Sequence, residues 1–167
     1  GYGNNVTSSS ATAVGQQNTV SGACGFSTGF GNSATGEDST AGGNNSAANG
    51  FSSFAHGVKV TASGYGAAAF GLWDAKATGQ GTFALGENNE ASNAYSMVMG
   101  QFVWEKSDAD IFTIGNGSTS GRSNAFRVTK NGDVYGISAY NSGGADYAEY
   151  FEWSDGNADS EDRVGYF

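Results

Sequence analysis

Small and large side chains alternate along the first part of this chain in units of seven residues, each opened by a glycine. Counted from that glycine, positions three and five are mostly Ser, Ala or Thr, whereas position four is often Thr, Phe or Met. Side chains on a β-strand alternate between its two faces, so this pattern predicts strands with one face of small groups and an opposite face of larger ones. Opposing strands can approach closely across the small face.

The glycines keep a strict register through most of residues 1–100. They recur every seven residues from Gly15 to Gly71 and resume, after one inserted residue, at Gly79. A fixed period in one chain is typical of a stack of similar units, each packed on its neighbours. The structural positions of the repeat are Gly15, Gly22, Gly29, Gly36, Gly43, Gly50, Gly57, Gly64, Gly71, Gly79, Gly86 and Gly100.

Position six shows that the true period is fourteen residues, because it alternates between a polar series and one that turns apolar. Two heptads per coil predict two short strands and two turns permitted by glycine, with each coil pairing in parallel with the next. A helical coiled coil is excluded, since each glycine would weaken a helix by about 1 kcal/mol. The polar series is Thr7, Ser21, Thr35, Asn49, Ser63, Thr78 and Ser92, and the other ends in Phe70, Leu85 and Met99.

Composition limits the alternatives and points to more than one chain. With 28 glycines, no proline and no glycine at every third position, the chain is not a collagen, and a disordered linker has no reason to keep register. An interior of Ser and Ala buries little apolar area, so the stacked coils alone are expected to be marginally stable. We therefore predict a homotrimer whose shared core uses the larger residues, among them Phe51, Phe54, Phe70, Trp73 and Leu85.

Charge and reactive side chains exclude several functions. The net charge of −9 argues against nucleic acid as a partner, and no apolar run is long enough to span a membrane. His56 has no Cys or Asp cluster at ligand spacing, so we place it in the apolar ladder and expect no metal or cofactor. Cys24, the single cysteine, is expected to be a small filler within the repeat. A flat polar ladder would suit ice binding, although the mixed chemistry of this one disfavours that alternative.

The repeat also resembles a known family. The pattern G-x-x-S-x-A-x, doubled to fourteen residues as in 43–56 (GNNSAANGFSSFAH), resembles the head repeat of YadA-like trimeric autotransporter adhesins over about 100 residues. The resemblance implies an all-β fold, a left-handed parallel β-roll in a tightly wound trimer, used in that family to bind host matrix or other surfaces. We assign this β-roll to residues 1–103. The repeat residues are architectural and indicate no ligand.

A different, hairpin-rich module is predicted for residues 104–140. Residues 110–117 (DIFTIGNG) predict a strand and turn, and residues 125–135 (AFRVTKNGDVY) predict a hairpin. Asn131 and Gly132 suit a type I′ turn, because both tolerate positive φ.

Alternation within this hairpin assigns its two faces. We expect Phe126 and Val128 to face a core, and Arg127 and Thr129 to face outward. No apolar heptad of a helical stalk follows the repeat, which argues against a conventional autotransporter.

The segments FTIGNG, SNAFRVTKNGDVY, SGGADYAEYFEW and EDRVGYF resemble the C-terminal region of phage tail-spike and appendage proteins. In those proteins, FEW-type segments open a trimeric intramolecular-chaperone domain that cuts itself off after assembly, which implies that residues 141–167 begin such a domain. Carried over, the resemblance implies cleavage between Asn141 and Ser142, with Asp146 and Glu149 as the acidic residues of the chemistry. One carboxylate would accept a proton and a protonated carboxyl would donate one to the leaving amine.

We therefore predict a structural and adhesive segment of an extracellular homotrimeric fibre, in the first place a phage tail fibre or appendage on a virion. Its partner would be a cell-surface glycan or protein receptor, and it would not be an enzyme. The alternatives are a bacterial surface adhesin that binds host matrix, and a single self-cleavage at Asn141–Ser142 in the full-length protein. The binding surface is expected at the less regular turn residues Phe30, Phe51, Tyr65, Trp73 and Tyr95.

Overall fold

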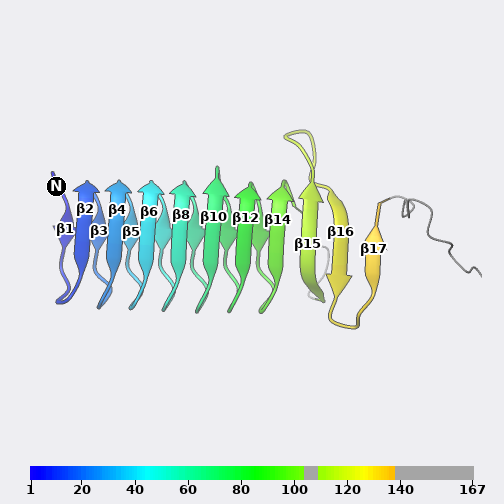
Figure 1. Ribbon diagram of the computed structural model, residues 1–167, viewed down its shortest axis with the longest axis horizontal. Helices are drawn as coiled ribbons and strands as arrows, with labels where there is room; N and C mark the ends of the chain where they lie inside the picture. Colours follow the sequence, from blue (N-terminus) through cyan, green and yellow to red (C-terminus); the bar gives the residue numbers. More distant parts are fainter. Residues whose placement is uncertain (104–108, 138–167) are drawn as a thin grey trace, which may run out of the picture.

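The chain forms a parallel β-solenoid, described here by a computed structural model over residues 1–103 and 109–137. These residues are all strands and turns, without a helix, and successive strands pair with a repeat of about 14 residues. In Figure 1 the chain rises along the front strands, returns behind them and advances one coil towards the C-terminus, which is a left-handed winding. The predicted all-β, left-handed parallel β-roll is confirmed.

Each coil contributes one short strand and one long strand to two separate sheets. The seven-stranded sheet contains only two-residue strands: β1 Asn5–Val6, β3 Thr19–Val20, β5 Ser33–Ala34, β7 Ala47–Ala48, β9 Thr61–Ala62, β11 Lys76–Ala77 and β13 Glu90–Ala91. The second sheet has ten strands, and its parallel part begins with the five-residue strands β2 Thr12–Gln16, β4 Phe26–Phe30, β6 Thr40–Asn44, β8 Phe54–Val58, β10 Ala68–Leu72, β12 Phe83–Glu87 and β14 Met97–Gln101.

The interior between the two sheets is narrow and built from small side chains. Alanines from the second position of both strand types, such as Ala41, Ala48 and Ala55, have no exposed surface. The largest apolar side chains that are fully buried are valines: Val20, Val60, Val98 and Val103. The predicted small face is therefore the interior.

The repeat glycines allow the close approach of neighbouring coils. A Cβ on Gly22, Gly36 or Gly50 would clash with the carbonyl oxygen of the glycine one coil further on, although none of these three has a positive φ. The corners are instead made mostly by other residues in the left-handed region, including Cys24 (φ 54°) and Asp38 (φ 55°). The prediction of turns permitted by glycine holds in part: L-residues occupy these corners in most coils, whereas seven repeat glycines, from Gly15 to Gly100, have positive φ at the fourth residue of the long strands, beside the second corner.

Buried asparagines form a hydrogen-bonded ladder at one edge of the interior. Asn18 Nδ2 donates to Gly29 O (2.9 Å), and its Oδ1 accepts from the backbone N (3.0 Å) and Nδ2 (3.1 Å) of Asn32 in the next coil. Asn4 Oδ1 accepts from Asn18 in the same way. Because each amide satisfies buried or partly buried backbone groups of a neighbouring coil, the ladder stabilises the stacking of the first coils.

We expect Asn18→Ala to lower the free energy of unfolding by about 2–3 kcal/mol. The substitution leaves the Gly29 carbonyl oxygen and the Asn32 backbone N–H without their hydrogen-bond partner in the interior. Urea denaturation of the purified protein measures this change. The matched control is Asn49→Ala, whose exposed side chain bonds only to Thr35 and whose loss should cost less than about 0.5 kcal/mol. Equal losses in the two variants would show that the ladder adds no stability.

The ten-stranded sheet continues beyond the repeat and then reverses direction. β15 (Asp110–Asn116) pairs in parallel with β14, and β16 (Asn124–Thr129) and β17 (Val134–Gly136) follow as antiparallel strands. The predicted hairpin is confirmed, but not its type I′ turn, since of Asn131 and Gly132 only Gly132 has a positive φ (88°). The backbone N of Gly132 donates to Thr129 O (3.0 Å), which closes a turn over residues 129–132 with the left-handed residue at its end.

The faces of this hairpin are the reverse of our prediction. Arg127 donates to Asp110 Oδ1 (2.7 Å), whose side chain is fully buried, and Thr129 is buried as well. Phe126 and Val128 pair with Ile114 and Phe112 on the outward side of the sheet. The register of β15 on β14 and the Asp110–Arg127 ion pair fix this orientation.

Candidate attachment surface

The outward side of the ten-stranded sheet carries a continuous row of large hydrophobic side chains. We call this surface the apolar face; it consists of the first and third residues of β8, β10, β12 and β14, the third and fifth residues of β15, and the partners of the latter on β16. Their aromatic rings touch from strand to strand, with centroids 5.1 Å apart for Phe54 and Phe70 and 5.6 Å for Phe70 and Phe83. Its members are Phe54, His56, Ala68, Phe70, Phe83, Leu85, Met97, Met99, Phe112, Ile114, Phe126 and Val128.

No carboxylate, ammonium or guanidinium group belongs to the apolar face. His56 is its only titratable member, and its ring lies beside Phe54 (6.4 Å) and over Gly42, where a Cβ would meet its Cδ2. His56 thus occupies the apolar ladder, as predicted. Among the described residues no group of three or more His, Cys, Asp or Glu side chains could hold a metal ion.

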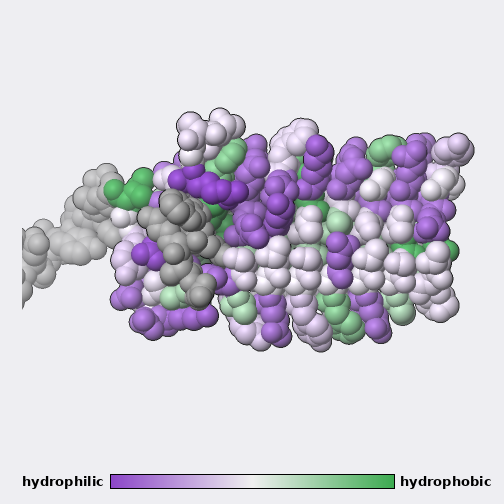
Figure 2. Space-filling view, turned by 180° about the vertical axis from the view of Figure 1, so that it is seen from behind, coloured by the Kyte–Doolittle hydropathy of each residue, from purple (hydrophilic) through white to green (hydrophobic). Residues whose placement is uncertain are grey.

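The opposite, seven-stranded sheet presents a polar surface. Figure 2 views the molecule from this side and shows a mosaic of hydrophilic and near-neutral residues, with hydrophobic ones scattered. The predicted polar series ending in Thr78 and Ser92 lies here, but Lys76 and Glu90 stand beside it on β11 and β13. Charged side chains of both signs interrupt the flat hydroxyl lattice that ice binding would need.

The predicted aromatic turn residues are exposed but do not form one site. Tyr65 (59% exposed) stacks on Phe51 with ring centroids 5.0 Å apart, and Tyr95 (69% exposed) lies over Gly81 at the same corner. Trp73 (51% exposed) lies at the other corner, where Lys59 Nζ is 5.1 Å from its ring centroid. Phe30 ends β4 and is also exposed.

Cys24 also lies exposed at a corner turn. The prediction that it fills space within the repeat is therefore wrong, because its left-handed backbone places it outside the alternation of the strands.

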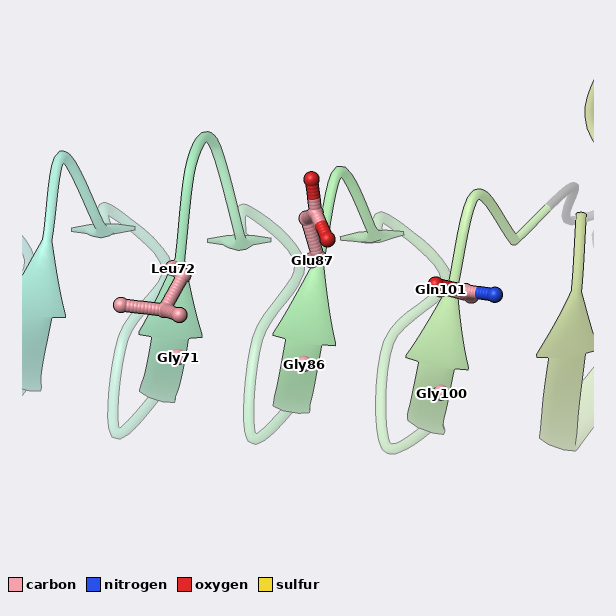
Figure 3. A pocket seen from close by; sticks show the side chains of 6 residues that line it. All are labelled: Gly71, Leu72, Gly86, Glu87, Gly100 and Gln101. Atoms are coloured by element: carbon pink, nitrogen blue, oxygen red, sulfur yellow. The ribbon is translucent and has the colours of Figure 1, made fainter. Parts of the chain in front are cut away.

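A shallow groove of about 480 Å³ crosses the carboxyl ends of three long strands (Figure 3). Gly71, Gly86 and Gly100 line it, together with the residues that follow them, Leu72, Glu87 and Gln101. Sequence reasoning missed the groove because it arises only when three coils stack. The available signal was the single inserted residue after Gly71.

The candidate cleavage residues Asn141, Ser142, Asp146 and Glu149 lie outside the described residues, as does the whole segment 141–167. Cleavage at Asn141–Ser142 stays a prediction from sequence.

No family model, no curated protein and no solved structure matches the chain. Within residues 1–103 and 109–137 there is no helix long and apolar enough to cross a membrane.

Proposed function

We propose that this chain is an attachment segment of an extracellular homotrimeric fibre, of the phage tail-fibre or appendage type. The apolar face is the observation that carries the proposal. A solenoid that buries Ala, Ser and Asn while leaving Phe54, Leu85 and Met97 exposed has its main hydrophobic surface outside. Contiguous apolar surface of this kind marks an interaction site in soluble proteins.

Charge supports a second copy of the same chain as the partner of this face. Identical chains each carry a net charge of −9, so most orientations bring like charges together. The apolar face has no fixed charge over its whole length, and copies that meet there avoid this repulsion. The threefold count and the attachment role rest on the resemblance to YadA-like heads and tail-spike proteins.

The exposed corners suit attachment because they project away from the apolar face. Tyr65 and Trp73 lie in turns at the two ends of β10, and both side chains are more than half exposed. Binding residues on turns of a rigid scaffold are common in recognition proteins. A fibre of three chains would present each corner three times, which raises the avidity for a repetitive cell surface.

Native mass spectrometry and light scattering at micromolar concentration test the assembly. We expect a single trimeric species, and a monomer or a dimer would overturn the proposed architecture. Fluorescently labelled protein incubated with bacterial and with mammalian cells tests attachment. Saturable binding to bacteria supports the phage-type role, binding to mammalian cells or matrix supports the bacterial adhesin, and binding to neither refutes attachment.

A further inference from the structure

We infer that Asn131 is a site of spontaneous deamidation, which the fold selects from three candidates of the same local sequence. In an asparagine–glycine pair the backbone nitrogen of the glycine reaches the asparagine side chain easily, because glycine has no Cβ to hinder the approach. The inference concerns a covalent modification and does not depend on the attachment function. The three pairs in the chain are Asn49–Gly50, Asn116–Gly117 and Asn131–Gly132.

The reaction needs only the chain and water. The backbone nitrogen of Gly132 loses its proton and bonds to Cγ of Asn131, the Cγ–Nδ2 bond breaks, and Nδ2 leaves as ammonia with that proton. The cyclic imide then takes up one water molecule and opens. Breakage of its nitrogen–Cγ bond gives aspartate, and breakage of its bond to the backbone carbonyl carbon gives isoaspartate, whose main chain runs through Cγ. Nothing is oxidised or reduced, and a neutral amide is replaced by a carboxylate.

The Asn131–Gly132 pair lies in the exposed turn between β16 and β17 (Figure 1). Nothing lies within 4 Å of a Cβ added to Gly132, and no residue in the described part of the chain holds the Asn131 amide by a hydrogen bond. Before the attack, one hydrogen bond must break, from Gly132 N to Thr129 O (3.0 Å). Water can replace this bond in an exposed turn, so the opening costs little free energy.

The Asn49–Gly50 pair lies between stacked coils instead. Gly50 is buried, and its backbone N donates to Ala62 O of the next coil (3.3 Å). A Cβ on Gly50 would clash with Gly64 O, so the backbone has no room to swing towards the side chain before it. Asn49 Oδ1 also accepts from Thr35 Oγ1 (2.8 Å), which restrains the amide. Attack at Asn49 therefore requires the coil to open.

The Asn116–Gly117 pair is held in a similar way at the end of β15. The backbone N of buried Gly117 donates to Gln101 O on the neighbouring strand (3.1 Å), and the backbone N of Asn116 donates to Ser123 O (3.1 Å). A Cβ on Gly117 would clash with Phe102 O. In both of these pairs the attacking nitrogen is bonded to a neighbouring segment within packed backbone, so local unfolding must come before the reaction.

The test is peptide mapping by mass spectrometry after the purified full chain has been kept at about pH 8 for about two weeks; each event raises the mass by about 1 Da. In the folded chain we expect Asn131 to react at least about tenfold faster than Asn49 or Asn116. In concentrated urea the three rates should agree within about threefold, because the unfolded chain removes the protection. Asn131→Gln should abolish the fast reaction, since glutamine would have to close a larger ring. Asn49→Gln is the matched control and should leave it unchanged.

Three results would overturn the inference. Equal rates at the three pairs in the folded chain would show that the fold does not select the exposed turn. A folded chain that stays unmodified at Asn131, while the chain in urea reacts there, would show that the turn holds the Gly132 nitrogen as firmly as the coils hold theirs. A fast rise in mass that persists in Asn131→Gln would place the modification at another residue.

Discussion

Gly50→Ala is expected to lower the free energy of unfolding by at least about 3 kcal/mol, because the new methyl group would overlap backbone that cannot move away. A Cβ on Gly50 would clash with Gly64 O of the next coil, and the same contact recurs through the stack. Gly50 itself has no positive φ, so the loss would come from the close approach of the coils alone. Urea denaturation monitored by far-UV circular dichroism measures it.

Gly66→Ala is the matched control for this prediction. Gly66 has a left-handed φ of 61°, yet nothing lies within 4 Å of its added Cβ. Neighbouring coils hold Asp38 and Ser52 at the same corner with similar φ, so alanine should cost only about 1 kcal/mol there. If Gly66→Ala proved as destabilising as Gly50→Ala, the glycine period would reflect backbone conformation instead of close packing.

Leu85→Asp is expected to convert the proposed trimer into monomers at micromolar concentration. Leu85 lies on β12 near the middle of the apolar face, and three copies would bring three carboxylates into one dry interface. Burying an unpaired carboxylate costs several kcal/mol, and mutual repulsion adds to that penalty. Size-exclusion chromatography with light scattering gives the mass directly.

Ser63→Asp supplies the matched charge on the opposite, polar surface, where Ser63 is exposed. It should leave the trimer intact, because its carboxylate stays in water. A Leu85→Asp protein that remains trimeric would place the contact between copies on another surface. A trimer lost in both variants would implicate net charge instead of the apolar face.

Much of the fold follows from the sequence because the same short pattern of residues recurs in every coil. Alternation of small and larger residues after the repeat glycines specifies the strand faces, and the fourteen-residue period specifies the parallel register, as in Ala69 beside Ala55. The asparagine ladder could also have been predicted, since Asn4, Asn18 and Asn32 are spaced by fourteen residues. The exposure of the aromatic turn residues followed from their place outside the alternation.

Other features depend on which residues stacking brings together. The groove needs Leu72, Glu87 and Gln101 from three coils, and no local pattern links them. The hairpin faces were decided by the pairing of Phe112 with Met97 and by the buried Asp110–Arg127 ion pair, both of which join segments distant in sequence. The period and composition of the sequence thus determined the solenoid. The orientation of the β16–β17 hairpin and the shape of the groove were decided by tertiary contacts. The physical reason is that the burial of a charge or an aromatic ring depends on neighbours that only the folded chain supplies.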